Sequence, residues 1–385
     1  MTSPVTSPEG FGIDHLPYGV VRHGGRTLCA ARYGDEAIDL AALDLSVDPA
    51  TFATPTLNRF CAAGSDAWTS VREELQSRIE NDEDLPTVPL AATEPVLPVE
   101  IGDYVDFYSS LHHATNLGRL FRPDSEPLLP NWRHLPIGYH GRSGTVAVTG
   151  TPVRRPSGLV KEGDNVVHRA CRNLDIELEV GFVVGPDIEA GSCPRPDEAA
   201  EHVFGVCLVN DWSARDIQAF EYQPLGPFLG KSFLTTMAAW ITPMEALRGA
   251  MVEPPSQVPE PADHLRASRP WGLDLDLAVE LNGATISRAG FSDLYWTFAQ
   301  QLAHMTSNGA SARPGDLFAS GTVSGPEEGT YGSLIELTWR GEKPLTLPDG
   351  SSRTFLEDGD TVVLRGSAGG GAVALAPVEG TVVSP

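Results

Sequence analysis

The stretch Leu174-Asp175-Ile176-Glu177-Leu178-Glu179-Val180 alternates apolar and acidic residues and continues into the apolar run 181–184. Alternation of this kind indicates a β-strand, on which residues two apart point to the same face, so Glu177 and Glu179 share a face. The apolar continuation predicts that the strand is mostly buried. Two buried carboxylates are costly unless a cation or hydrogen-bond donors neutralise them, and a divalent metal site is therefore one interpretation.

A second stretch, Leu273 to Leu281, has the same alternation and ends in Asn282-Gly283, a strong hairpin signal. It is typical of a half-buried strand whose acidic face is in water. The pattern alone favours this solvent-face interpretation for both stretches. A metal site at Glu177 and Glu179 therefore needs independent support.

Length and charge limit the class of protein. The chain has 385 residues, which predicts two domains, and 41% of them are hydrophobic, enough to build a core. The net charge is −24 and the isoelectric point about 4.7. Such a surface repels nucleic acid and anionic membranes. A small anionic substrate remains compatible, provided that its site carries Arg and Lys.

The cysteines and the apolar pattern indicate a compartment. Five scattered cysteines without a C-x-x-C pair form neither a disulfide framework nor a zinc ribbon. No signal-peptide core follows Met1, and no apolar run reaches the length of about 18 residues that spans a membrane. We expect a soluble protein of the reducing cytoplasm.

Common catalytic motifs do not account for this chain. It contains neither a G-x-S-x-G elbow nor an H-E-x-x-H pair. The segment 226–232 resembles a phosphate-binding loop, but only three residues separate its glycines and Pro227 removes one amide, so we reject nucleotide binding. Lys231 in this segment is either a positioned cation or a surface charge.

The first third of the chain predicts a small domain. A short strand is expected at Thr27 to Ala31, and a helix with Ser65 as its N-cap continues to about residue 80. Four prolines punctuate the segment 86–98, which we interpret as a linker. The predicted domains are therefore 1–98 and 99–385.

Strand signals dominate the second domain, so we predict a mostly β (α+β) fold. One helix is expected within 291–305, ending at Asn308-Gly309, and another begins near Ser213. The Pro-rich stretch from Pro254 to Pro270 is expected to be a surface insertion. The predicted strands are 145–148, 177–184, 203–209, 273–281, 316–320, 334–339 and 361–364.

Two further segments carry candidate chemistry. Asp211 follows the apolar strand 203–209, where it could bind a ligand or could bond its own backbone in a turn. In the segment 103–113, a helix that begins near Ser109 would bring His113 within two turns of Asp106. Imidazole is suited to proton transfer near neutral pH. Four other histidines are predicted to be hydrogen-bonded packing residues: His112, His134, His140 and His304.

These pieces together are similar to a known family. The motifs that carry the resemblance are Asp106-Phe107-Tyr108-Ser109-Ser110, His113-Ala114-Thr115-Asn116, Pro130-Asn131-Trp132, Gly138-Tyr139-His140-Gly141-Arg142, Asp175-Ile176-Glu177-Leu178-Glu179, Asn210 to Gln218, Gly226 to Ser232 and Ala319-Ser320-Gly321-Thr322. The chain resembles the fumarylacetoacetase family over nearly its whole length. It departs at Leu111 and His112, where that family often has Arg and Gln, but the motif register still selects His113.

The resemblance implies an SH3-like N-terminal barrel and a C-terminal mixed β-sandwich roll, assembled as a homodimer. It also implies a divalent ion, and four oxygen ligands without His or Cys suit Ca²⁺ or Mg²⁺. Lys231 and Arg215 match positions that compensate the negative charge, and Thr235 matches a further residue associated with the ion. The implied ligands are Asp106, Glu177, Glu179 and Asp211.

The implied reaction is hydrolysis of the carbon–carbon bond of a β-diketone to fumarate and acetoacetate, the last step of tyrosine and phenylalanine breakdown. His113 matches the base that activates water, and Glu336 matches the acid that orients it. Donors to the tetrahedral oxyanion match Arg215, Gln218 and Lys231. The substrate-contacting positions match Tyr108, Arg122, Tyr139, Gln218, Tyr222 and Thr322.

Two other classes of function remain open. One is a relative with the same metal core, such as an acylpyruvate hydrolase or a decarboxylase or isomerase of 2-hydroxy-dienoates. Such relatives share Glu177, Glu179 and Asp211 and differ in the base, and the presence of both His113 and Glu336 favours hydrolysis. The other is a non-catalytic Ca²⁺-binding structural protein, for which the cluster of Arg215, Gln218 and Lys231 would be unnecessary.

Overall fold

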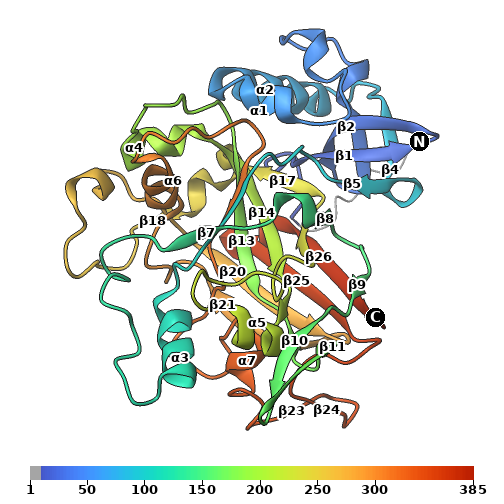
Figure 1. Ribbon diagram of the computed structural model, residues 1–385. Helices are drawn as coiled ribbons and strands as arrows, with labels where there is room; N and C mark the ends of the chain where they lie inside the picture. The colour runs from blue at the N-terminus through green and yellow to red at the C-terminus, as the bar shows by residue number, and fades with distance from the viewer. Residues whose placement is uncertain (1–9) are drawn as a thin grey trace.

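The computed structural model describes residues 10–385 (Figure 1). The prediction that no export signal follows Met1 falls partly on residues 1–9, which lie outside the described residues. The predicted mostly β class is confirmed, because the described chain is built on a 13-stranded mixed sheet and a five-stranded sheet. Among the helices of residues 10–385, none combines the length and the apolar character needed to cross a bilayer.

The N-terminal part is a small antiparallel sheet with two helices beside it (Figure 1). Its strands are β1 (Tyr18–His23), β2 (Arg26–Tyr33), β3 (Glu36–Asp39), β4 (Thr87–Pro89) and β5 (Glu94–Val96), and its helices are α1 (Asn58–Ala62) and α2 (Ser65–Glu80). The Pro-rich segment 86–98 is thus not a plain linker: β4 pairs with β3 and β5 pairs with β1. Proline is tolerated there because both strands are short and lie at sheet edges.

The large sheet passes from the N-terminal part into the body of the molecule. Strand β1 pairs with β17 (Trp240–Pro243), and the order continues through β14 (Val203–Asp211), β13 (Leu178–Val184), β22 (Leu317–Ala319), β6 (Tyr104–Phe107) and β7 (Gly138–His140). Every residue of β13 and β14 is buried. Phe182 of β13 stacks on Phe298 and Phe318, with ring centroids 5.1 and 5.3 Å away, so this strand lies at the centre of the core.

The second sheet packs beside the first and contains the other acidic strand. Its order is β21 (Ala284–Gly290), β20 (Leu275–Leu281), β25 (Thr361–Ala368), β26 (Val373–Val383) and β9 (Val153–Arg154). Strands β25 and β26 contact β14 of the large sheet, as Figure 1 shows. Strand β20 is half buried, as its alternation predicts, and Asn282-Gly283 turns it into β21.

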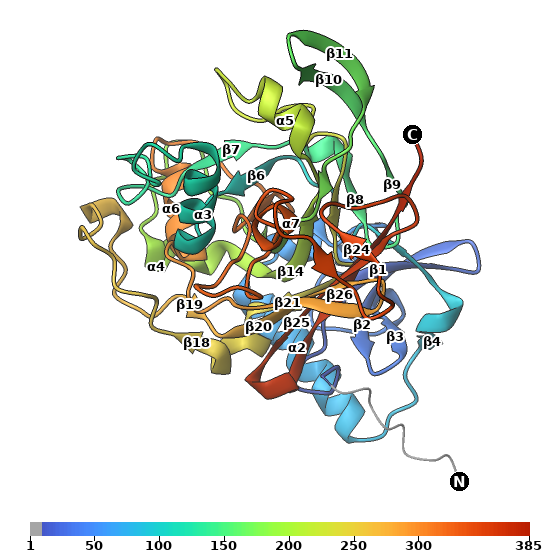
Figure 2. The same cartoon turned by 90° about the horizontal axis from the view of Figure 1, so that it is seen from below.

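The remaining elements are short. Strand β16 (Thr235–Met237) joins β14 to β8 (Val146–Val148), and the hairpin of β10 (Ser157–Glu162) and β11 (Asn165–Ala170) stands away from the body next to α5 (Arg215–Glu221) in Figure 2. The insertion 254–270 lies at the surface, as predicted, between β18 (Met251–Val252) and β19 (Gly272–Leu273). The others are β12 (Leu174–Asp175), β15 (Ser213–Ala214), β18 (Met251–Val252), β19 (Gly272–Leu273), β23 (Leu345–Thr346), β24 (Ser352–Arg353), α3 (Leu111–Phe121), α4 (Pro196–Ala199), α6 (Phe298–Thr306) and α7 (Leu334–Leu337).

Two predictions of secondary structure are wrong. The expected strand 334–339 is instead α7, because Asp175 accepts hydrogen bonds from the amides of Leu334 and Ile335 and fixes the first turn. The helix expected within 291–305 begins only at Phe298, where Thr297 and Gln300 form a capping box. The preceding apolar residues are buried in turns, so their helix-like spacing was misleading.

The helix starts also differ in detail. Gly64, with φ of 85°, holds the N-cap position of α2, and Ser65 is the first helical residue. Ser213 does not cap α5; it lies in β15 and its hydroxyl donates to the carbonyl of Asp211. Ser110 caps α3 by accepting a hydrogen bond from the amide of His113, one residue later than the predicted start near Ser109.

Candidate active site

The structure brings together the four acids that the sequence selected. One carboxylate oxygen from each of Asp106, Glu177, Glu179 and Asp211 lies within 4.8 Å of the others, and all four residues are buried. They come from neighbouring parts of one sheet. Asp211 ends β14, Glu179 lies on the adjacent β13 with Glu177 just before that strand, and Asp106 lies on β6.

The loop after β22 allows β6 to approach this cluster. Strand β22 pairs with both β13 and β6, and it places Asp106 opposite Ala319. Gly321 follows with φ of 75°, and a side chain on it would come within 2.1 Å of the carbonyl oxygen of Phe107. Only glycine permits this conformation and this contact. The sequence Ala319-Ser320-Gly321 thus positions the strand that carries Asp106.

The acid cluster has too few hydrogen bonds for its burial. Oδ1 of Asp106 and both carboxylate oxygens of Glu179 are buried without a hydrogen-bond partner. Burial and the neighbouring carboxylates raise the pKa of Asp106 and of Glu179 well above their usual values. Orphaned, buried oxygens converging on one point fit a hard cation, which takes oxygen ligands. The cluster could therefore hold a metal ion.

Two cations neutralise the other half of the cluster. Nζ of Lys231 donates to Oδ2 of Asp211 at 2.6 Å and also to Glu177. Nη2 of Arg215 lies 2.8 Å from Oε1 of Glu177, although its direction is poor for a hydrogen bond. Four carboxylates and two cations leave two formal negative charges, which one divalent ion would balance.

These contacts also set the ionisation of Glu177. Burial alone would raise the pKa of Glu177, but Lys231 and Arg215 outweigh burial and lower this pKa to about 2. Thr235 adds a hydrogen bond of 2.7 Å from its hydroxyl to Oδ1 of Asp211. Glu177 and Asp211 are therefore held in place by charged or hydroxyl donors of the protein, whereas Oδ1 of Asp106 and both carboxylate oxygens of Glu179 have no donor.

A buried imidazole–carboxylate pair lies beside the cluster. Nδ1 of His113, on α3, is 2.7 Å from Oε2 of Glu336, on α7. Glu336 also accepts hydrogen bonds from Asn116, Ser324 and Ser333. Burial would raise its pKa, but His113 and these donors lower it below the usual value. An ionised Glu336 fixes the proton of His113 on Nδ1, so Nε2 is the nitrogen free to act as a base.

The oxyanion donors proposed from the sequence are neighbours. Nη1 of Arg215 donates to Oε1 of Gln218 at 3.2 Å, one turn along α5. Lys231 lines a cavity of about 190 Å³ that reaches the acid cluster through Asp211. The other lining residues are Tyr104, Tyr139, His140, Gly141, Arg142, Thr145, Pro227, Phe228, Ser232 and Thr235.

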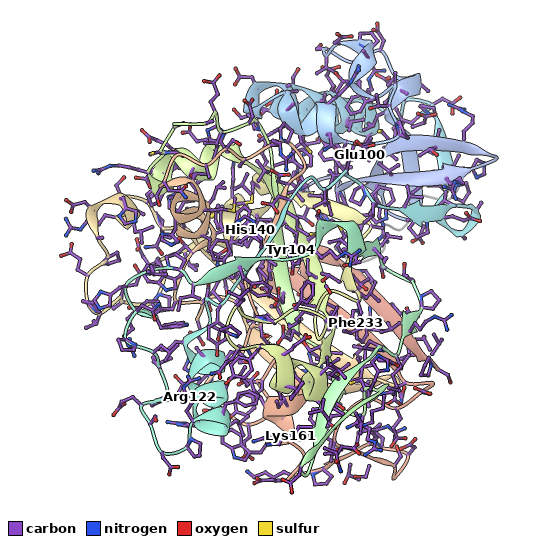
Figure 3. All side chains as sticks on the ribbon, in the orientation of Figure 1. Glu100, Tyr104, Arg122, His140, Lys161 and Phe233 are labelled. Carbon is purple, nitrogen blue, oxygen red and sulfur yellow. The ribbon has the colours of Figure 1, made fainter. Side chains whose placement is uncertain are left out.

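The proposed substrate contacts are less uniform. The ring of Tyr108 packs edge-on against His113, with ring centroids 5.4 Å apart, and Tyr139 lies next to Asp106. Oγ1 of Thr322 and Nε of Arg122 are buried without a hydrogen-bond partner. Figure 3 shows Arg122 at the end of α3, apart from Tyr104 on β6. Tyr108 therefore lies on the His113 side of the site and Tyr139 on the carboxylate side.

One predicted substrate residue, Tyr222, is largely exposed to solvent. Tyr222 is the C-cap of α5 and is 44% exposed. None of the hydrogen bonds found in residues 10–385 links its phenol to the acid cluster or to His113. Its contact with the substrate stays a prediction.

The chain matches known proteins along almost all of its length. Residues 14–103 match the family model described as "Fumarylacetoacetase N-terminal", and residues 104–383 match "Fumarylacetoacetate (FAA) hydrolase C-terminal". The chain is 45% identical over 390 residues to fumarylacetoacetase of Homo sapiens, which covers 94% of this chain and 93% of that protein. The chain belongs to the fumarylacetoacetase family. The family member of Arabidopsis thaliana is 42% identical over 390 residues, covering 94% and 92%.

Solved structures share the fold of this fumarylacetoacetase family member. Fumarylacetoacetate hydrolase of Exiguobacterium antarcticum superposes with a TM-score of 0.60 at 14% identity, covering 96% of this chain and 100% of that one. Maleylpyruvate hydrolase of Sphingobium sp. SYK-6, solved with manganese(II) and pyruvate, gives 0.56 at 15% identity, covering 96% and 99%. These likenesses concern the fold alone.

Contacts of two buried residues of this family member, Asp175 and Asn210, were missed from the sequence. Asp175 belongs to the same acidic alternation as Glu177 and Glu179, but it bonds Arg215 and α7 instead of joining the cluster. That third acid in the alternation was the available signal. Oδ1 of Asn210 accepts a hydrogen bond from the amide of Glu177, and no sequence pattern marked this contact.

The packing roles predicted for two histidines are wrong. His134 and His140 are exposed, and Nδ1 of His140 pairs with Oδ2 of Asp103 at 2.9 Å. His140 lines the cavity next to the cluster. His304 is partly buried and lies against His264, with ring centroids 6.1 Å apart.

Proposed function

We propose that this chain hydrolyses the carbon–carbon bond of fumarylacetoacetate, a β-diketone, to fumarate and acetoacetate, the last step of tyrosine and phenylalanine catabolism. The observation that carries the proposal is the His113–Glu336 pair, buried beside four converging carboxylates and two cations. The relatives named fumarylacetoacetase, at 42 to 45% identity over nearly the full length, support the same activity.

The acid cluster is proposed to be the metal centre. Asp106, Glu177, Glu179 and Asp211 would hold Ca²⁺ or Mg²⁺ as oxygen ligands, with Lys231 and Thr235 holding Asp211 in place. The orphaned oxygens of Asp106 and Glu179 support this assignment. When bound, the ion would supply a Lewis acid that polarises the carbonyl and stabilises the enolate charge.

His113 is proposed to be the general base. Its Nε2 takes a proton from a water molecule while the water oxygen bonds to the carbonyl carbon at the scissile bond. Glu336 stabilises the imidazolium that forms, since its Oε2 accepts a hydrogen bond from Nδ1 of His113, 2.7 Å away. When the carbon–carbon bond breaks, the electron pair leaves with the acetoacetate carbon. The proton held on His113 can then be returned to that carbon, so water is added across the bond.

The negative oxygen of the tetrahedral intermediate needs donors in a site without bulk water. Arg215, Gln218 and Lys231 are proposed for this role. Nη2 of Arg215 is buried and lies 2.8 Å from Oε1 of Glu177 without a well-directed hydrogen bond, so its positive charge faces the site in which the oxyanion would form. A single preorganised donor of this kind typically contributes about 3 kcal/mol to transition-state stabilisation.

The remaining polar groups are proposed to bind the two carboxylates of the substrate. Arg122 and Thr322 are supported by their buried, unpartnered atoms, and Tyr108 and Tyr139 by their contacts with His113 and Asp106. Tyr222 would contact the substrate from the exposed end of α5.

The alternative functions have less support. A dienoate decarboxylase or isomerase could use the same acids, but isomerisation and decarboxylation need no activated water, whereas His113 and Glu336 form a pair suited to making one. An acylpyruvate hydrolase would need the same activated water, and it has less support because the relatives at 42 to 45% identity are named fumarylacetoacetase. For a structural Ca²⁺ protein, the cluster of Arg215, Gln218 and Lys231 would be unnecessary.

We also infer a homodimer in the cytoplasm, with a domain boundary near residue 98. The apolar side chains of Phe220, Leu225 and Phe228 are exposed on and after α5, and a second subunit could bury them in a dimer interface. The matches to the two family models meet between residues 103 and 104, close to the proposed boundary. All five cysteines are free thiols, as a reducing compartment requires.

The test is a spectrophotometric assay of fumarylacetoacetate with purified protein, with fumarate and acetoacetate quantified as products. The proposal expects turnover that EDTA abolishes and that Ca²⁺ or Mg²⁺ restores. An acylpyruvate offered in parallel should be hydrolysed more slowly. Absence of turnover with both ions, or faster turnover of the acylpyruvate, would overturn the proposed function.

A further inference from the structure

Asp175 is a buried carboxylate that the proposed mechanism does not use. It ends β12, is 0% exposed and accepts four hydrogen bonds. Two come from the first two backbone amides of α7, those of Leu334 at 2.7 Å and Ile335 at 3.1 Å. The others come from Nε of Arg215 at 2.8 Å and from its neighbour Ile176 N at 2.7 Å.

The bonds to Leu334 and Ile335 determine where Glu336 lies. Helix α7 is four residues long and has no capping side chain of its own at Ser333. So short a helix is not stable by itself, and an acceptor for its first amides must come from elsewhere. Asp175 supplies this acceptor, and Glu336 follows immediately, bonded to His113.

The hydrogen bond from Nε of Arg215 to Asp175 determines the orientation of the guanidinium and the direction of its two Nη atoms. With Nε held by Asp175, Nη1 reaches Gln218 and Nη2 lies beside Glu177 without a well-directed hydrogen bond. Without that anchor the planar guanidinium could rotate into a bidentate pair with Glu177, the geometry that Arg and carboxylates prefer. Nη2 of Arg215 would then donate to Glu177 and would no longer point toward the proposed oxyanion.

We propose that Asp175 is a positioning residue that sets the base and the oxyanion donor relative to each other. One buried carboxylate holds Arg215 with one oxygen and the turn that carries Glu336 with both. Asp175 thus joins α5, through Arg215, to α7, through Leu334 and Ile335. The inference rests on the proposed function, because it assigns Asp175 a role in that reaction.

The test compares Asp175→Asn with Asp360→Asn. Asp360 is the matched control: it is 2% exposed and likewise accepts from an arginine, Arg353 Nε at 2.9 Å, and from a backbone amide, Glu357 N at 2.8 Å. The control contacts neither His113 nor Arg215. Both variants should lower the melting temperature, so stability alone cannot separate them.

Activity per folded, metal-loaded chain separates them. Asp175→Asn should lower kcat about 10- to 100-fold, the usual effect of removing a residue that orients catalytic groups, with little change in KM. Asp360→Asn should leave kcat unchanged. In the Glu336→Gln background the kcat effect of Asp175→Asn should shrink, because the two changes disturb one unit. Equal kcat in Asp175→Asn and Asp360→Asn would overturn the proposal. So would a double variant, Asp175→Asn with Glu336→Gln, in which the two fold-losses of kcat simply multiply.

A second readout does not depend on turnover. The Nδ1 proton of His113, shared with Glu336, should give a downfield NMR resonance that shifts in Asp175→Asn and stays in place in Asp360→Asn. An unchanged resonance in Asp175→Asn would refute the link through α7. If Asp175→Asn does not fold, Asp175→Glu retains the charge but displaces the oxygens, and the same losses in kcat and resonance position are expected. If the unaltered chain does not turn over fumarylacetoacetate, the proposed function fails, while the NMR result still tests the positioning.

Discussion

Strands β13 and β20 share an alternation of leucine and acid but have opposite environments. Both faces of β13 are covered, and its Glu179 is buried without a hydrogen-bond partner. One face of β20 meets solvent, where Asp276 is exposed and Glu280 pairs with Arg365 at 2.8 Å. Alternation therefore determines which residues share a face, and only the packing of other layers determines whether that face is buried. A buried acidic face requires a partner, and here the partner is inferred to be a metal ion.

The largest difference between the two strands should appear when one acid on each is replaced by its neutral amide. Glu179→Gln should abolish metal binding, because the ion loses a carboxylate ligand. Turnover should fall by more than about 100-fold, which is the upper end for substitutions of residues that only orient a metal ligand. Asp276→Asn should change neither. Elemental analysis of the purified variants and the fumarylacetoacetate assay measure both effects. A full metal content in Glu179→Gln would remove the reason for placing the ion in this cluster.

The second prediction separates the base from the metal centre. His113→Gln should lower kcat by about 10²- to 10⁴-fold, the range for general-base catalysis, while the metal content is retained. His112→Gln, one position earlier on α3 and partly exposed, is the matched control and should keep most of the activity. Loss of the ion together with activity in His113→Gln would argue against the assignment as a base.

Metal should also stabilise the buried acidic strand. A ligand at 100 times its Kd adds about 2.7 kcal/mol to the free energy of unfolding, so saturating Ca²⁺ or Mg²⁺ should raise the melting temperature of the EDTA-treated chain. The same increase should occur in Asp276→Asn and disappear in Glu179→Gln. Differential scanning calorimetry measures the shift. An equal shift in all three proteins would place the stabilising ion elsewhere.

The smallest effect concerns acid pH and the anchor of His113. The pKa of Glu336 is lowered in the folded chain, so its contribution to stability is present above the ordinary value of 4.5 and is lost as pH falls below that value. Urea unfolding of the EDTA-treated chain at pH 7 and pH 4 should therefore show a smaller acid-induced loss in Glu336→Gln than in the unaltered chain or Asp276→Asn. Equal losses in all three would contradict an ionised, stabilising Glu336.

Local sequence predicted the strands and the acids well, because alternation and strand ends can be recognised from neighbouring residues alone. It failed where distant residues determine structure. Residues 334–339 read as a strand, yet they begin with a helix whose first amides bond Asp175, 159 positions earlier. The proline-rich segment 86–98 read as a linker because its pairing partners, β1 and β3, cannot be identified from its own composition. The convergence of β6 with β13 and β14 came from the family resemblance, since no local pattern encodes it.

The most direct test of the metal centre is calorimetric titration of the EDTA-treated chain with Ca²⁺ or Mg²⁺, with turnover of fumarylacetoacetate measured along the same titration. One ion should bind per chain, turnover should rise in proportion to the bound ion, and Glu179→Gln should show neither effect. Full turnover by a chain shown to be free of metal, or unchanged ion binding in Glu179→Gln, would contradict a catalytic ion held by the buried carboxylates.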